Sequence, residues 1–191
     1  DATGISVYNT AVGYAAGLSV TTGVRNTLIG GLAGDALTTA ADNTAVGYAA
    51  LGANTTGHSN VAVGMSALDA NTDADHNTAI GDHALSSNTT AHNNTAVGAD
   101  ALLANTTGTD NVALGESSLL SNTTANYNTA VGKSALRVNT TGANNTALGK
   151  GSLYANTTAD ANTAVGYNSL NANTTGASNV AVGYLALDAN T

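Results

Sequence analysis

Short apolar segments recur along this chain at a fixed spacing of 17 residues, and polar segments rich in Asn, Thr and Gly separate them. An Asn opens each unit, from Asn9 to Asn179, and a Gly follows four residues later in all eleven units. We number the positions of a unit from this Asn. A period that persists without insertion or deletion is typical of a solenoid or a fibre.

The first five positions of a unit predict a short β-strand. In residues 94–98, side-chain alternation places Thr95 and Val97 on one face and Ala96 on the other. We expect the larger residue at position 4 and the Leu at position 9 to form the core, and the small Ala to face another wall of the coil or a second chain. The predicted core is Val46, Leu51, Val63, Leu68, Ile80, Leu85, Val97, Leu102, Leu114, Leu119, Val131, Leu136, Leu148, Leu153, Val165, Leu170, Val182 and Leu187.

The Gly at position 5 directly follows the predicted strand, where a coil must turn sharply. Glycine allows a positive φ or a close backbone approach without steric cost. The predicted turn glycines are Gly47, Gly64, Gly81, Gly98, Gly115, Gly132, Gly149, Gly166 and Gly183.

A second corner is predicted at the Asn-Thr-Thr segment, where the Asn at position 12 can bend the chain through hydrogen bonds or the left-handed region. This segment is also an N-glycosylation acceptor. Glycans on stacked coils about 4.8 Å apart would crowd, so we expect the Asn side chains to form an amide ladder instead. The predicted ladder is Asn54, Asn71, Asn88, Asn105, Asn122, Asn139, Asn156 and Asn173.

The predicted fold is all-β, a parallel β-solenoid or β-roll of about eleven 17-residue coils. A helix fits poorly, because Asn, Thr and Gly disfavour helix interiors. Residues 1–42 depart from the pattern, with Leu28 in place of Ala and Val20 and Leu37 in place of the second Asn. We expect irregular N-terminal repeats, a cap or a transition there. Residues 43–191 form the regular array, which we expect to continue beyond this segment.

Composition and charge narrow the function classes. A net charge of −8, from 12 acidic and 4 basic residues, disfavours nucleic-acid binding. The absence of Cys excludes disulfides, and no apolar run is long enough for membrane insertion in this segment. The hydrophobic content comes mainly from Ala, Val and Leu, which predicts a thin, layered core.

Few residues suggest chemistry. Asp and His cluster in residues 75–83, but the four histidines occupy three different positions of the unit, so stacking does not bring all of them together and we expect no metal site. No catalytic motif occurs, and we expect neither enzyme activity nor a cofactor. Tyr48, Tyr167 and Tyr184 at position 6 are candidate surface contacts for a glycan, or else simple surface variation.

The phrase Asn-Thr-Ala-Val-Gly-x-x-Ala-Leu-x-x-Asn-Thr-Thr-Gly resembles the repeat region of phage tail-fibre-like proteins. It is similar, more distantly, to the head repeats of trimeric autotransporter adhesins, as in residues 61–64 and 78–81. The resemblance covers roughly residues 9–191 and implies a left-handed parallel β-roll assembled as a homotrimer. The unit is longer than the adhesin repeat and its Asn-Thr-Thr corners are denser, which leaves a filament of stacked coils as the other form of self-association.

The pattern and the resemblance together suggest a structural component of an extracellular fibre, on a virion or as a cell-surface filament. Such a tail-fibre shaft or adhesin would act as an extended scaffold and attachment surface in cell adhesion, with a cell-surface glycan or protein receptor as candidate partner. Two alternatives remain. The Asn and Thr columns could form an ice-binding surface, or the chain could self-assemble into a functional amyloid-like filament.

Overall fold

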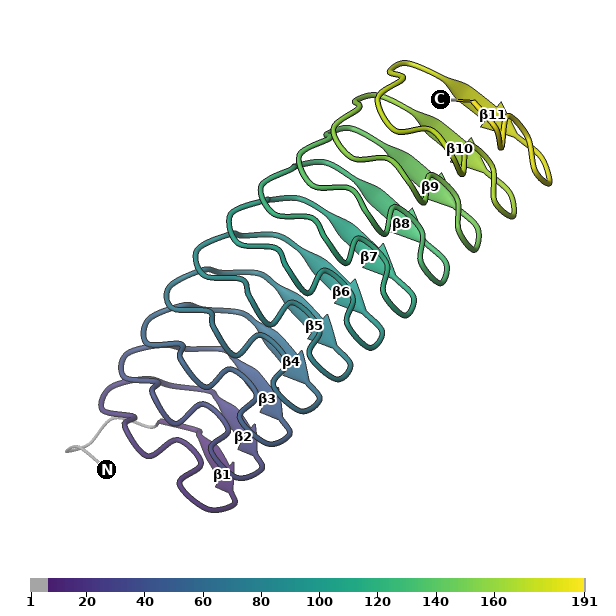
Figure 1. The fold of residues 1–191 in the computed structure, drawn as a ribbon. Coiled ribbons are helices and arrows are strands. Elements are labelled where there is room, and N and C mark those ends of the chain that lie inside the picture. Colours follow the sequence, from purple (N-terminus) through teal and green to yellow (C-terminus); the bar gives the residue numbers. More distant parts are fainter. Residues whose placement is uncertain (1–6, 191) are drawn as a thin grey trace.

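The computed structural model describes residues 7–190, and these form an all-β parallel solenoid. Figure 1 shows an elongated body of stacked coils, with the N-terminal and C-terminal coils at opposite ends. Each coil contributes one short strand, and the rest of the coil is turn and irregular backbone. The described residues contain no helix that is long and apolar enough to cross a membrane.

Eleven parallel strands pair in chain order to form a single sheet. Every neighbouring pair is in register at a spacing of 17 residues, as in Thr95↔Val112, Ala96↔Ala113 and Val97↔Leu114. This confirms the predicted all-β solenoid with 17-residue coils. The strands are β1 (Thr10–Val12), β2 (Thr27–Ile29), β3 (Thr44–Val46), β4 (Val61–Val63), β5 (Thr78–Ile80), β6 (Thr95–Val97), β7 (Val112–Leu114), β8 (Thr129–Val131), β9 (Thr146–Leu148), β10 (Thr163–Val165) and β11 (Val180–Val182).

Hydrogen bonds between coils continue around the corners. The Leu102 N–H donates to the Ser118 carbonyl at 3.0 Å, and the Thr106 N–H donates to the Thr123 carbonyl at 2.9 Å. Backbone groups that a single coil would leave unpaired are thus satisfied by the coils on either side. The stack as a whole, rather than any single coil, is the stable unit.

The core is a row of small and branched side chains enclosed by each coil. The Ala at position 3, as in Ala96, is completely buried, as is the residue at position 8, such as Ala101. The predicted Leu column is also buried, with one exception: Leu187 is 53% exposed, because no further coil covers it in the structure. The buried members are Leu51, Leu68, Leu85, Leu102, Leu119, Leu136, Leu153 and Leu170.

The prediction that position 4 belongs to the core is wrong. These side chains point outward from the sheet with the residues at position 2, and Ala96 and its equivalents point inward. The coil is narrow, and its interior is already filled by one Leu and two Asn, so only Ala fits on the inner face of the strand. The partly exposed residues are Val46, Val63, Val97, Val131 and Val165, and the exposed ones are Ile80, Leu114, Leu148 and Val182.

Two columns of buried Asn side chains run along the solenoid. At position 12, Asn105 Nδ2 donates to Asn88 Oδ1 of the previous coil at 3.1 Å and to the Gly108 carbonyl at 2.9 Å. At position 1, Asn94 Nδ2 donates to the same carbonyl at 2.9 Å, and Asn94 Oδ1 accepts the backbone N–H of Asn111 at 3.0 Å. Both Asn side chains of a coil therefore hold its second corner in place.

The ladder predicted at position 12 is present, while the column at position 1 was not assigned from sequence. The corner is bent by hydrogen bonding, since the Gly57 N–H donates to Asn54 Oδ1 at 3.1 Å. Asn54 itself does not have a positive φ. The ladder consists of Asn54, Asn71, Asn88, Asn105, Asn122, Asn139, Asn156 and Asn173, all completely buried.

The turn glycines have the conformation that the sequence predicts. Their φ values lie between +128° and +139° in the nine regular coils. At Gly98, an added Cβ would lie 2.6 Å from the carbonyl carbon of Gly115 in the next coil. Both the backbone conformation and the distance between coils therefore require glycine at this position.

The irregular second coil has a large side chain at position 3 and none at position 9, the reverse of the regular coils, and its core is still filled. Leu28 replaces Ala at position 3, whereas Gly34 replaces Leu at position 9. A Cβ on Gly34 would lie 2.8 Å from Leu28 Cδ2, and a Cβ on Gly17 would lie 2.7 Å from Leu28 Cδ1. The side chains of Leu28 and the buried Leu37 therefore occupy the space that Leu fills in later coils.

Candidate functional site

The outer face of the sheet is a continuous surface that runs along all eleven strands. It consists of the outward side chains at positions 2 and 4, all of them Thr, Val, Ile or Leu. Leu114 is 38% exposed, Leu148 46% and Val182 69%. We call this surface the sheet stripe: Thr10, Val12, Thr27, Ile29, Thr44, Val46, Val61, Val63, Thr78, Ile80, Thr95, Val97, Val112, Leu114, Thr129, Val131, Thr146, Leu148, Thr163, Val165, Val180 and Val182.

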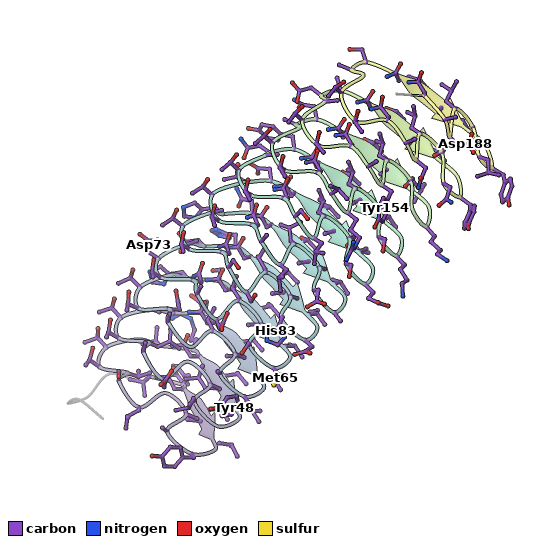
Figure 2. All side chains as sticks on the ribbon, in the orientation of Figure 1. Tyr48, Met65, Asp73, His83, Tyr154 and Asp188 are labelled. Carbon is purple, nitrogen blue, oxygen red and sulfur yellow. The ribbon has the colours of Figure 1, made fainter. Side chains whose placement is uncertain are left out.

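The sheet stripe contains no charged residue, whereas charged residues occur at several other positions of the unit. The charged side chains of residues 7–190 occur only at positions 6, 7, 10, 14, 16 and 17. In Figure 2, Asp73 lies on the edge opposite to Tyr48, Met65 and His83. With a spacing of about 4.8 Å per coil, eleven coils form an uncharged strip roughly 48 Å long.

The three predicted contact tyrosines are exposed, but the structure groups only two of them. Tyr167 and Tyr184 stack on successive coils, with ring centroids 5.3 Å apart and an angle of 12° between the rings. Tyr48 lies several coils away and is 59% exposed. Stacking depends on position 6 being Tyr in consecutive coils, which happens only at the C-terminal end of the described array.

A hollow of about 320 Å³ opens beside Tyr167, on the side of the coils that follows the strands. It exists because Gly151 has no side chain at position 7, and Asn168 leans over it from the next coil. The Asn171 side chain donates from Nδ2 to the Gly151 carbonyl at 2.9 Å. We call this the tyrosine hollow, lined by Ser134, Lys150, Gly151, Tyr154, Tyr167, Asn168 and Asn171.

Two cations flank the tyrosine hollow. The Lys150 ammonium lies 5.8 Å from the centre of the Tyr167 ring. The Arg137 guanidinium lies 5.9 Å from the Tyr154 ring centre, and Nη1 donates to the Tyr154 hydroxyl at 3.0 Å. Sequence reasoning missed this group because its members come from three successive coils. The signal was available, since positions 6, 7 and 10 share one edge in successive coils.

His58, Asp75 and His92, all at position 16, have a structural role. His58 Nδ1 accepts the Ala41 N–H at 2.9 Å, the His58 N–H donates to Asp75 Oδ1 at 2.6 Å, and His92 Nδ1 accepts the Asp75 N–H at 2.9 Å. Position 16 is therefore a column of hydrogen-bond acceptors for the preceding coil. Within residues 7–190, no three His, Cys, Asp or Glu side chains are arranged to hold a metal ion.

The shifted carboxyl groups lie away from the tyrosine hollow. A hydrogen bond from Arg25 lowers the pKa of Asp42, which Arg25 contacts through two of its nitrogens at 2.6 and 2.7 Å. Partial burial raises the pKa of Asp69 at position 10 of the fourth coil. Neither Asp42 nor Asp69 lines the tyrosine hollow.

The Asn side chains of the Asn-Thr-Thr corner are not available at the surface. The Asn side chains are buried, so their Nδ2 atoms are neither open to glycosylation nor part of an outward surface. The first Thr is committed as well, since Thr106 Oγ1 donates to the Thr123 carbonyl at 3.1 Å. The second Thr, as in Thr107, is exposed, and the first Thr ranges from half-buried, as in Thr106, to exposed, as in Thr55. The ice-binding alternative therefore loses the Asn columns on which it was based.

In comparison with known proteins, no family model matches the chain, and neither curated proteins nor solved structures give a significant match.

Proposed function

We propose that this chain is the shaft of an extracellular fibre, in which parallel copies associate through the sheet stripe. The observation that carries the proposal is an uncharged, partly exposed row of Thr, Val, Ile and Leu along every coil. Exposed apolar surface of this extent commonly marks an interface. In this assembly the protein acts mechanically, as a scaffold that holds an attachment surface away from its base.

A second copy of the chain is the occupant that fits the stripe best. Its side chains repeat at the coil spacing, so two copies match coil for coil over their full length. Charged residues flank the stripe but never enter it, so no like charges would be buried on association. The resemblance to tail-fibre and adhesin repeats supports three chains around one axis, with the stripes facing inward and the variable edges outward.

The molar mass of the native protein in solution tests this association. One chain has a mass of 18.5 kDa, and we expect a multiple of that value, three for the homotrimer. Replacing Val97 and Leu114 together by Lys would place charges in the stripe and should reduce the mass to one chain. The matched control replaces Met65 and Ala99 by Lys, at position 6, where Lys133 and Lys150 already occur.

Cysteine cross-linking provides a second measurement that does not depend on a destabilised variant, because the chain has no native Cys. Under oxidising conditions, Thr95→Cys in the stripe should give covalent dimers on a denaturing gel. Thr107→Cys, at the exposed corner, should not. A wild-type mass of one chain, with no cross-link through residue 95, would refute the proposed interface.

The other functions predict different results in the same preparation. A monomer that lowers the freezing point more than its concentration explains would be an ice-binding protein, using the outward Thr and Val of the stripe. Particles that lengthen with time at constant width would indicate a filament growing through the open strand edges. A fibre shaft predicts a fixed length and no effect on freezing.

A further inference from the structure

We infer that the tyrosine hollow is a binding site for a carboxylated sugar, such as a uronic or sialic acid residue of a glycan. The inference rests on the geometry of this one chain. It therefore holds whether or not copies associate through the sheet stripe, and it adds a ligand class to the attachment surface of the proposed fibre.

Local charge points to an anionic ligand. Residues 117–159 carry three of the four Lys and Arg of the chain and no Asp or Glu, on a protein with a net charge of −8. Lys133 is neutralised by Glu116, with a distance of 2.8 Å between Nζ and Oε2. Lys150 forms no such pair among the described residues, so its ammonium is available at the edge of the hollow.

The lining fits a sugar better than a simple anion. Tyr184 stacks on Tyr167 and Arg137 lies over Tyr154, so these two tyrosines offer their ring edges and hydroxyl groups to a pyranose ring. The amides of Asn168 and Asn171 and the hydroxyl of Ser134 offer donors and acceptors for sugar hydroxyls. The volume of about 320 Å³ is at the lower end of the range for ligand sites, which suits one or two sugar units.

Lys150 is the cation that can recognise the carboxylate, because it lines the hollow. Lys150 Nζ lies over Tyr167, while Arg137 is held against Tyr154 by its bond to the phenol oxygen. A carboxylate beside Lys150 would gain a charge-assisted hydrogen bond, which is stronger than a neutral one. The acid nearest to the hollow at position 10 is Asp188, one coil beyond Asn171, and its charge limits the site on that side.

The test compares acidic and neutral sugars on the native protein by saturation-transfer NMR and calorimetry. Probes are 3′-sialyllactose against lactose, and a galacturonic acid trimer against a galactose trimer. We expect at least one acidic probe to bind about tenfold more tightly than its neutral partner, with a preference that weakens at high salt. Equal affinity for both members of each pair, or no binding of either acidic probe at millimolar concentration, would overturn the inference.

Variants of residues outside the hydrophobic core locate the site. Lys150→Gln should abolish the preference for the acidic sugar, and Tyr154→Ala should weaken binding of both sugars. The matched control is Lys133→Gln, at the same position one coil earlier, which should leave binding unchanged. An equal loss in Lys133→Gln, or tighter binding of a tetraglutamate peptide than of either sugar, would refute a saccharide site. The molar mass of each variant, measured in parallel, separates failure of this site from failure of the proposed fibre assembly.

Discussion

At the residue scale, the coil depends on non-glycine residues with a positive φ. In the coil that begins at Asn94, Asp100, Leu102 and Asp110 have φ values of +55°, +53° and +58°, and other coils repeat these positions. Such residues cost about 1–2 kcal/mol each relative to the right-handed region. At position 9 the burial of Leu offsets this cost, whereas at the exposed position 17 the side chain gains no burial that would offset it.

Ala161 at position 17 therefore provides a test in which glycine should stabilise the protein. Its φ is +58° and its side chain is exposed, so Ala161→Gly should raise the free energy of unfolding by about 0.5–1 kcal/mol. Ala143 at position 16 is not in the left-handed region, and Ala143→Gly should lower it by about 0.5–1 kcal/mol. Urea unfolding measures both, and a loss of stability in both variants would contradict the argument.

Residue conformations were only partly predictable from the sequence. The turn glycines can be predicted from the sequence, because no other residue occurs at position 5. The positive φ at positions 7, 9 and 17 has no such signal, since Ala, Ser, Leu, His and Tyr all occur there. The residues at these positions donate hydrogen bonds to a neighbouring coil, and those bonds favour the positive φ. The residue types within one coil do not reveal such bonds.

At the scale of the repeating element, the buried Asn ladder should contribute more than its size suggests. Asn105→Ala would remove Nδ2 donors to Asn88 and Gly108 and an Oδ1 acceptor for Asn122. We expect a loss of roughly 2–4 kcal/mol in the free energy of unfolding. The control is Thr107→Ala two residues later, which is exposed and should change stability by less than about 0.5 kcal/mol. Similar melting curves for the two variants would mean that the ladder adds little.

The strand shows where element-scale prediction succeeds and where it fails. The alternation correctly separated position 3 from positions 2 and 4, because that period is a property of the strand itself. It could not decide which face is inner, and the larger Val97 was assigned to the core in place of Ala96. That choice depends on the width of the coil interior, which is set by Leu102 and the Asn side chains on the opposite walls.

At the scale of the whole molecule, architecture was the most predictable property and assembly the least. Eleven equal units with no insertion dictate stacking in register, and the paired strands follow from it. The tyrosine hollow is harder to predict, because the shared edge of positions 6, 7 and 10 becomes hollow only where one side chain is missing, at Gly151, between neighbours from three coils. Such a site is a local departure from the repeat, and a repeat pattern describes only what the units share.

The register of the whole stack leads to a prediction about deletions. Deleting residues 94–110 removes one complete coil and joins Asn93 to Asn111, which preserves every spacing of 17 residues. In a solenoid whose stability comes from each coil and its contacts with neighbours, the variant should keep a single unfolding transition and melt a few degrees lower.

Deleting residues 94–109 instead leaves one extra residue in the joined coil. Because strands and corners alike are hydrogen-bonded to the next coil, no loop is free to absorb that residue. We expect this variant to melt lower still or in two steps, and to be cut by protease at the junction. Identical melting and protease resistance of the two deletions would show that the corners tolerate a change of register.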